Sequence, residues 1–231
     1  MKIFSMSVYG ENPRYITGAF RQIELCQKFF PNWQIRIYTD NFDTFSSVTD
    51  QVTLAHGDPN VFGMFWRFLP MFESPDNIVI VRDSDSRVTM REQLAVNEWI
   101  SSTQSFHTMR DHDAHYEWPI IGTMFGYKGQ LSDSLYNSMI NHQGNHYYTA
   151  DQVWLRDCVW PTVKDDAMIH CMNSNTWFSY TRKLLKTPYS FCGNGYYEND
   201  MPIYPPSLAP GWQITDADKF DEGIMNKDRI F

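Results

Sequence analysis

The sequence predicts an α/β fold built around a layered, mainly parallel central sheet. Short runs of β-branched and aromatic residues alternate with longer segments in which apolar residues recur every three or four positions, and turn residues separate them. Strands that alternate with helices in this way pair in parallel, because each helix carries the chain back across the sheet. With 231 residues, 42% of them hydrophobic, the chain can bury one full core, so we expect a single domain over 1–231.

The first hundred residues predict four strands and three helices. Each strand is a β-branched or aromatic run that ends at turn residues, and the third strand is the weakest. The first helix has apolar residues at helical spacing and stops at a proline, while the second is a dense apolar segment interrupted by the single charge of Arg67. In chain order we expect a strand over 3–8, a helix over 16–30, strands over 35–38 and 52–54, a helix over 62–69, a strand over 78–81 and a helix over 89–100.

The remaining residues predict three more strands, two helices and an irregular tail. The second of these strands is apolar and contains glycines, where a backbone or a ligand could approach closely. From residue 188 onward, the density of glycine, proline and aromatic residues predicts a tail that packs on the sheet or covers a site. In chain order we expect strands over 106–110 and 118–127, a helix over 131–140, a helix from 148 with Thr149 as its N-cap, and a short strand over 168–171.

Composition excludes several classes of protein. A net charge of −8 and a pI near 5.3 argue against a nucleic-acid binder, which needs clustered Lys and Arg. The four cysteines form no C-x-x-C pair, which favours reduced thiols over a disulfide scaffold or a zinc finger. The N-terminal stretch turns polar too early for a signal peptide, and no run approaches the ~20 apolar residues of a membrane span. We therefore expect a cytoplasmic protein without a transmembrane segment.

The most informative stretch is the apolar run 78–81, which delivers Asp83 and Asp85 to its end. Residues two apart on an extended chain point the same way, so both carboxylates can face one hard cation. Two carboxylates held this close repel each other, and each loses hydration as the strand end is covered. A divalent cation would resolve that cost, which makes the pair a candidate metal and diphosphate site.

The alternative for this motif is a solvated turn in which Ser84 and Ser86 cap a following helix. The sequence context favours the metal interpretation, because an apolar strand precedes the pair and three arginines surround it. Arginine offers fork-shaped donors that suit phosphate oxygens. These arginines are Arg82, Arg87 and Arg91.

Other residues have both a structural and a functional interpretation. Tyr9, at the end of the first strand, either covers the core or forms an aromatic platform at the carboxyl edge of the sheet. Arg67 either snorkels to solvent or reaches over the sheet to phosphates. Asp151 either complements a helix N-terminus or is aimed at a reacting hydroxyl. The His and Asp residues over 111–115 favour a solvated bend over a zinc site, and a lone histidine such as His170 is usually a hydrogen-bonded structural residue.

The order of these motifs resembles the GT-A class of nucleotide-sugar-dependent glycosyltransferases, and within it a group of short bacterial and viral members. The resemblance runs from the first strand to about His170. It implies a three-layer α/β fold that transfers a sugar from a nucleotide-diphosphate donor to a hydroxyl of a glycan or other acceptor, with Mn²⁺ or Mg²⁺ as cofactor. Four landmarks carry it: the Arg-Asp-Ser-Asp-Ser-Arg run at 82–87, the segment 109–115, the glycine-bearing strand 120–126, and the pair Asp151-Gln152.

The resemblance also implies a role for individual residues and for parts of the chain. It makes 1–105 a nucleotide and donor half, 106–185 an acceptor half and 186–231 an irregular tail. The implied roles are metal binding by Asp83, Asp85 and His170, donor binding by Tyr9, Arg67, Asp83 and Arg87, acceptor binding by Asp111, His112 and Gly122, and a catalytic carboxylate at Asp151.

Two other functions fit parts of the same pattern. An acidic pair after an apolar strand also opens the chemistry of phosphohydrolases, in which Asp83 would be the nucleophile. In those enzymes the pair follows the first strand, whereas here considerable α/β structure precedes it. The eight tryptophans and thirteen tyrosines also suit a non-catalytic carbohydrate-binding protein, since aromatic faces stack against sugars.

Overall fold

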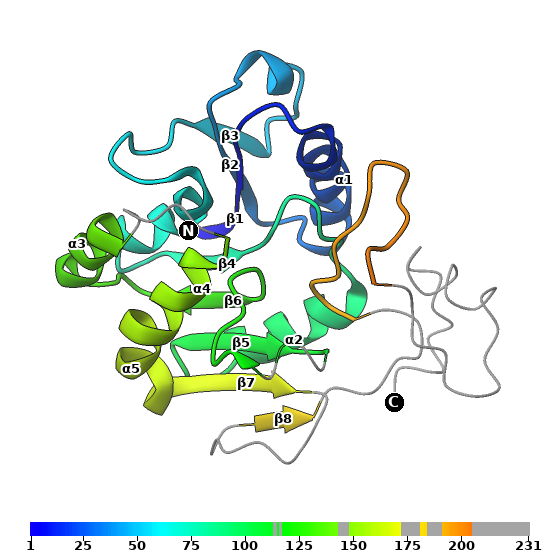
Figure 1. The fold of residues 1–231 in the computed structure, drawn as a ribbon. Helices are drawn as coiled ribbons and strands as arrows, with labels where there is room; N and C mark the ends of the chain where they lie inside the picture. Colours follow the sequence, from blue (N-terminus) through cyan, green and yellow to red (C-terminus); the bar gives the residue numbers. More distant parts are fainter. Residues whose placement is uncertain (113–114, 116, 143–147, 172–180, 184–190, 205–231) are drawn as a thin grey trace, which may run out of the picture.

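The computed structural model describes residues 1–112, 115, 117–142, 148–171, 181–183 and 191–204. Within this part of the chain, eight strands form one sheet around which helices pack on both faces (Figure 1). The strands are β1 (Lys2–Val8), β2 (Gln34–Thr39), β3 (Val52–Ala55), β4 (Ile78–Val81), β5 (Phe106–Arg110), β6 (Phe125–Lys128), β7 (Ala167–Cys171) and β8 (Thr181–Lys183).

The sheet has the strand order β3-β2-β1-β4-β6-β5-β7-β8. Strand β6 is antiparallel to its neighbours β4 and β5, and the other adjacent pairs are parallel. The predicted α/β class with a mainly parallel sheet is therefore confirmed. Because six of the sequence-predicted strands recur near their expected bounds, local β-branched content was a sufficient guide to them.

Local hydrogen bonds cap the starts of α1 and α2. Helix α1 (Pro13–Phe29) starts with a proline, and the side chain of Asn12 caps it by accepting from the Arg14 N–H. Helix α2 (Met90–Ile100) is capped by Thr89, whose hydroxyl accepts from the Glu92 N–H. The other helical segments are α3 (Asp133–His142), α4 (Ala150–Trp154), α5 (Trp160–Val163), the 3₁₀ segments η1 (Asp43–Phe45), η2 (Gly63–Phe72) and η6 (Lys164–Asp166), and a π-helical turn η5 (Leu155–Val159).

Two apolar layers cover the two faces of the sheet, because successive strand residues point to opposite sides. Phe4 and Ile80 pack toward α1 and α2, together with Trp99. Ile3 and Val79, their chain neighbours, pack on the other face against η2, α3 and α4. Figure 1 shows the same separation, with α1 on one side of the sheet and α3, α4 and α5 on the other.

The helix expected over 62–69 is present as the 3₁₀ helix η2, which runs past Pro70. Two other sequence-based expectations about elements were wrong. The strand expected over 118–127 begins only at Phe125, because Pro119 has no N–H for a ladder and the Gly122 N–H donates to the Gln152 side chain. Thr149 makes no capping bond, since its backbone is left-handed with φ of 79°.

The cysteines and the lengths of the helices bear on the class of protein. No disulfide links the four cysteines, all of which lie in the described part of the chain. Among the same residues, the structure has no helix with the length and apolar character needed to cross a bilayer.

A buried ion pair ties α2 to the sheet. Arg82 Nε donates to Glu92 Oε1 at 2.5 Å, and Arg82 Nη1 donates to the carbonyl oxygens of Val81 and Phe125 at 2.6 and 3.1 Å. The two side chains are 0% and 1% exposed. Arg82, which the sequence suggested as a phosphate ligand, is therefore part of the core.

Replacing Glu92 with alanine should lower the free energy of unfolding by about 3–5 kcal/mol, because a buried guanidinium loses its counter-charge. Equilibrium unfolding in urea measures the loss. Glu24→Ala is the control, since its pair with Arg21 is exposed on α1 and should contribute at most about 1 kcal/mol. Equal losses in the two variants would contradict a structural role for the buried pair.

Candidate functional site

The candidate site lies at the carboxyl edge of the sheet, between β1 and β4. From β1 the chain proceeds to β2 and β3 on one side of the sheet, and β4 then adds on the other side of β1. Such a reversal of strand order is where open α/β sheets bind ligands. Tyr9 follows β1 and Asp83 follows β4, so the two sequence-predicted residues flank this point.

The loop after β4 is held rigidly by one side chain from α1. Gln22 is fully buried and donates to the Asp83 carbonyl at 3.1 Å and to Ser86 Oγ at 2.8 Å. Its own amide oxygen accepts from the Val88 N–H at 3.1 Å. The interpretation in which Ser84 and Ser86 cap the next helix is wrong, because Thr89 occupies that cap.

Helix α1 packs directly on the backbone of the acidic pair. A β-carbon added at Gly18 would lie 2.6 Å from the Ser84 carbonyl oxygen and 2.8 Å from the Asp85 Cα. No other residue type fits this approach without moving one backbone or the other. The sequence signal was available, because a glycine inside a strongly amphipathic helix usually has a packing reason.

Arg67 bridges two of the predicted acids. Its Nη1 donates to Asp83 Oδ1 at 2.7 Å and its Nη2 to Asp151 Oδ2 at 2.6 Å. The residue is only 7% exposed, and its carbonyl accepts from Ser5 Oγ of β1 at 2.7 Å. Arg67 therefore does not snorkel to solvent, and the structure brings Arg67, Asp83 and Asp151 together.

The other acid of the pair is met by an arginine that the sequence analysis missed. Arg14 Nη2 donates to Asp85 Oδ2, and the side chains are 28% and 6% exposed, respectively. Arg14 is the second residue of α1, which begins shortly after β1 ends. That position at the carboxyl edge of the sheet was the available signal, because residues just after parallel strands meet at one edge.

Loss of hydration and the surrounding charges shift the pKa of Asp83. Withdrawal from water raises the pKa of its carboxyl to about 6; Arg67 opposes this shift, and Asp85 and Asp151 add to it. The Asp83 side chain nevertheless keeps 34% of its surface exposed, so it is open to a ligand. A cation placed against the pair would favour the ionised form.

The two carboxylates suit a hard divalent cation whose coordination shell is completed by water and by substrate oxygens. Within the described residues, no group of three or more His, Cys, Asp or Glu side chains could hold a metal ion by itself. Mg²⁺ and Mn²⁺ commonly take one or two carboxylates and complete their shell with water and substrate phosphates. Asp83 and Asp85 therefore fit such an ion, whereas a closed zinc site does not fit here.

His170 does not lie with the acidic pair. It sits in β7, which two strands separate from β4, and both of its ring nitrogens have partners. Nδ1 lies 2.9 Å from His107 Nε2, and Nε2 lies 3.1 Å from Glu98 Oε2. The implied role as a third metal ligand is corrected, because strand order keeps this histidine away from Asp83 and Asp85.

Arg87 faces the tail and not an open donor site. It donates to Asp200 Oδ1 from Nε and Nη2 at 3.1 and 2.8 Å, and its guanidinium lies 4.9 Å from the ring centre of Tyr196. Arg91 likewise pairs with Asp111. The arginines that the sequence placed around a phosphate thus serve to fix the surrounding chain.

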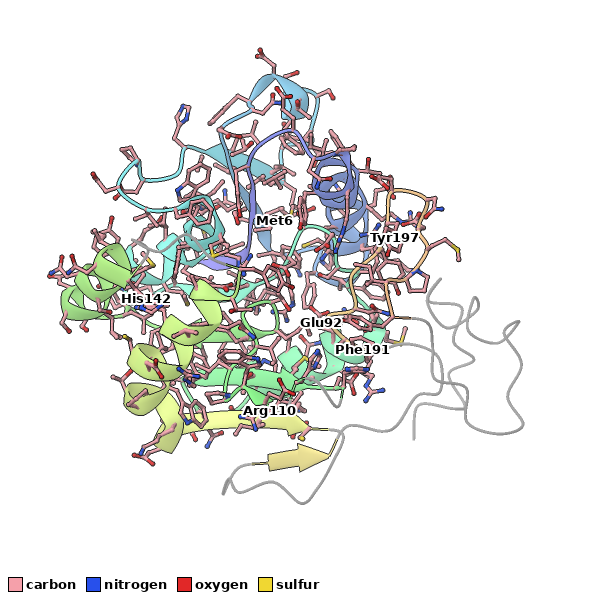
Figure 2. The ribbon with its side chains drawn as sticks, in the orientation of Figure 1. Met6, Glu92, Arg110, His142, Phe191 and Tyr197 are labelled. Atoms are coloured by element: carbon pink, nitrogen blue, oxygen red, sulfur yellow. The ribbon has the colours of Figure 1, made fainter. Side chains whose placement is uncertain are left out.

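Residues 191–204 form a strap over the loop after β4. Gly195 makes an antiparallel bridge with Ser86, and the Tyr196 N–H donates to the Asp85 carbonyl at 2.9 Å. Figures 1 and 2 show this segment, in orange, running beside α1, with Tyr197 next to the helix. We refer to residues 191–204 as the strap.

Two residues implied to bind an acceptor instead hold the strap. Asp111 Oδ2 accepts from the Cys192 N–H at 2.9 Å. Burial raises the pKa of Asp111 to about 6, against the opposing effect of Arg91. His112 stacks on Phe191, with ring centres 4.2 Å apart. Asp111 and His112 therefore contact the strap, and His112 also lies 5.6 Å from the ring of Tyr204.

Gly122, by contrast, lies against Asp151, one of the acids bridged by Arg67. A β-carbon added there would be 2.9 Å from Asp151 Oδ2 and 2.8 Å from Gln152 Oε1. The Gly122 N–H donates to Gln152, and Asp151 Oδ1 accepts from the Gln152 N–H at 2.8 Å. Two of the sequence landmarks, the glycine-bearing segment and the Asp-Gln pair, are thus in contact.

On the other side of the site, Tyr9 packs edge-on against two aromatic rings. Its ring centre lies 5.6 Å from Phe62 and 5.9 Å from Trp66. Next to it, the carboxyl ends of β1 and β2 border a surface pocket of about 670 Å³. The pocket is lined by Gly10, Glu11, Asp40, Asn41, Phe42, Asp43 and His56.

Exposed tyrosines gather around the acidic pair. Tyr148 is 90% exposed and Tyr204 is 54% exposed. The rings of Tyr15 and Tyr197 lie 5.4 and 5.9 Å from the Arg14 guanidinium. Some loss of hydration and, next to it, the negative charge of nearby Asp83 raise the pKa of the Tyr148 phenol, although most of its surface is exposed. We call Tyr15, Tyr148, Tyr197 and Tyr204 the tyrosine rim.

Comparisons with known proteins add one distant likeness. No family model matches the chain, and no curated protein matches its sequence. Among solved structures, the chain is similar to the crystal structure of a glycosyltransferase involved in the glycosylation of the major capsid of PBCV-1, at 10% sequence identity and a TM-score of 0.43. The likeness covers 74% of this chain and 81% of that one. A likeness at this level carries no argument about the reaction.

Replacing Arg67 with methionine should raise the pKa of Asp83 above its value of about 6, because the guanidinium that favours the carboxylate is lost. A carboxyl ¹³C NMR titration measures this shift. The free energy of unfolding should fall by about 3–5 kcal/mol, since Asp151 stays buried without its counter-charge. Arg21→Met on the exposed face of α1 is the control, and an unchanged Asp83 pKa in Arg67→Met would contradict the bridge.

Proposed function

We propose that the protein is a metal-dependent glycosyltransferase of the GT-A class that moves a sugar from a nucleotide-diphosphate donor to a hydroxyl of a glycan acceptor. One observation carries the proposal. Two carboxylates, Asp83 and Asp85, are held at the switch point of an α/β sheet, and each is faced by an arginine. This combination of acids and guanidinium groups suits a cation and a diphosphate that bind together.

Asp83 and Asp85 would hold the Mn²⁺ or Mg²⁺ ion. Bound there, the ion supplies positive charge that offsets the charge growing on the leaving nucleoside diphosphate. Arg67 adds a fixed guanidinium beside Asp83, in a buried position where its charge is weakly screened. The pocket at the carboxyl ends of β1 and β2 is of a suitable size for the nucleoside. Tyr9 directly precedes Gly10, one of the residues that line it.

The tyrosine rim supports a saccharide as the acceptor. Tyrosine faces stack against the apolar faces of sugar rings, and the phenol hydroxyls can hydrogen-bond to sugar hydroxyls. Asp151, next to Gly122, accepts from Arg67 Nη2, whereas Asp83 accepts from Nη1 of the same guanidinium. We assign Asp151 to the acceptor hydroxyl, where it would accept the proton if the reaction inverts the anomeric centre.

The same assignment divides the chain by task. Residues 1–105 would bind the nucleotide and the donor, and 106–185 the acceptor. The strap belongs to the tail, and its contacts with Ser86 and Asp85 support a role in closing the donor site.

Replacing Asp85 with alanine should abolish the Mn²⁺-dependent stabilisation of the protein by a nucleotide sugar. A ligand that binds only the folded chain raises the melting temperature, by an amount that depends on its concentration relative to Kd. A thermal-shift screen of nucleotide sugars with and without Mn²⁺ measures the effect. Asp165→Ala, an exposed acid outside the site, is the control and should leave the shift intact.

Two further measurements separate the other two functions. Stabilisation by a glycan without nucleotide or metal would favour a carbohydrate-binding protein. A phosphoryl adduct trapped on Asp83 would favour a phosphohydrolase. A nucleotide sugar that stabilises the Asp85→Ala variant as well as the unaltered chain would refute the proposed donor site.

Replacing Asp151 with asparagine should lower kcat by about 10²–10⁴-fold if this carboxylate is the general base. The affinity for the donor should change little, since Asp83 and Asp85 remain. Steady-state kinetics gives kcat, and calorimetric titration gives the donor affinity. Because the amide keeps the shape of the side chain and one hydrogen bond to Arg67, an unchanged kcat would exclude the base assignment.

A further inference from the structure

We propose that Arg14 is an exchangeable counter-ion: in the ligand-free protein it neutralises Asp85, and once a divalent cation takes that carboxylate it transfers its guanidinium to the diphosphate of the donor. The inference rests on the proposed function and adds to it a residue and an order of binding. The cation would bind first and the diphosphate second.

The backbones of the two residues are fixed relative to each other. Arg14 lies in the first turn of α1, where its N–H donates to the Asn12 side chain at 3.1 Å. Four residues further along α1, Gly18 packs against the Asp85 backbone, closer than a β-carbon would allow. An exchange of partners therefore requires only rotation of the Arg14 side chain.

The ion pair between Arg14 and Asp85 covers one carboxylate oxygen of Asp85. Arg14 Nη2 lies on Asp85 Oδ2, and a β-carbon added at Gly195 of the strap would be 3.1 Å from that nitrogen and 3.3 Å from that oxygen. The Asp85 side chain is 6% exposed, so no second cation can reach Oδ2 while the guanidinium occupies it. A metal ion that binds Asp85 through Oδ2 must therefore displace Arg14.

Arg14 has an N–H donor that no described protein group uses and that an anion could accept from. Its Nε is buried and has no hydrogen-bond partner among the described residues. A guanidinium offers five N–H donors in a fork that matches phosphate oxygens. The side chain is 28% exposed and lies between the rings of Tyr15 and Tyr197, which stabilise the cation without directional bonds and so permit it to turn. Figure 2 shows Tyr197 at this end of α1.

Charge supports the order of binding. Asp83, Asp85 and Asp151 with Arg14 and Arg67 leave one negative charge in excess, which repels a diphosphate. A divalent cation reverses the sign of the site and makes it attractive to that anion. Once Asp85 is bound to the cation, the guanidinium of Arg14 is left in need of a new anionic partner.

The test measures two affinities on the full chain, with Arg14→Gln. Mn²⁺ binding without nucleotide, followed by electron paramagnetic resonance, should tighten by about two- to fivefold because a competing cation is removed. Uridine and guanosine diphosphates, titrated in turn at saturating Mn²⁺, should bind about 10- to 100-fold more weakly because a charged hydrogen bond is lost. The exchange of partners by Arg14 thus predicts that Mn²⁺ affinity rises and diphosphate affinity falls.

Two further variants serve as controls. Arg21→Gln removes an exposed arginine of the same helix, whose partner is Glu24, and should change neither affinity. Arg14→Lys keeps the positive charge but not the fork, so Mn²⁺ affinity should stay near that of the unaltered chain while diphosphate affinity falls.

The outcomes separate the inference from the function on which it rests. If Arg14→Gln weakens both ligands, Arg14 only supports Asp85, and the exchange is overturned. If Mn²⁺ binding tightens and diphosphate binding stays constant, the transfer to the diphosphate is overturned. If the unaltered chain binds no Mn²⁺, the proposed function fails and the exchange fails with it.

Discussion

The site depends on charge compensation between three carboxylates and two guanidinium groups at one edge of the sheet. Asp83, Asp85 and Asp151 lie close enough to repel one another, and burial makes an uncompensated charge costly. Arg67 joins the loop after β4 to helix α4, and Arg14 joins the same loop to α1. These ion pairs therefore hold four separate segments, η2, α1, α4 and the loop after β4, around one point. A cation with a bound anion could replace these partners.

Glycines make that compensation sterically possible. Gly18 lets α1 approach the backbone of the acidic pair, Gly122 lets the segment before β6 approach Asp151, and Gly195 lets the strap approach Asp85. A β-carbon would lie 2.6 Å from the Ser84 carbonyl oxygen at Gly18 and 2.9 Å from Asp151 Oδ2 at Gly122, both closer than van der Waals contact. At Gly195 it would lie 3.3 Å from Asp85 Oδ2, which is a tight contact. The reversal of strand order between β1 and β4 provides the space at the sheet edge into which these segments converge.

Residue types that suit ligands also serve the structure elsewhere in the same sheet. His170 belongs to a hydrogen-bonded series with His107 and Glu98, and His107 also stacks on Trp99. Burial keeps the pKa of His107 well below its usual value, so this histidine is neutral. The series links the buried histidines of β5 and β7 to Glu98, whose side chain is half exposed on α2.

The sequence alone determined what depends on neighbours along the chain: six of the strands, the first helix, and the acidic pair that follows a buried strand. These follow from side-chain alternation, apolar spacing and local hydrogen bonds. The partner of each charge was decided only by the tertiary structure, since Arg14 is separated from Asp85 by 71 positions and Arg67 from Asp151 by 84. Strand order likewise removed His170 from the site, because no local pattern specifies which strands become neighbours.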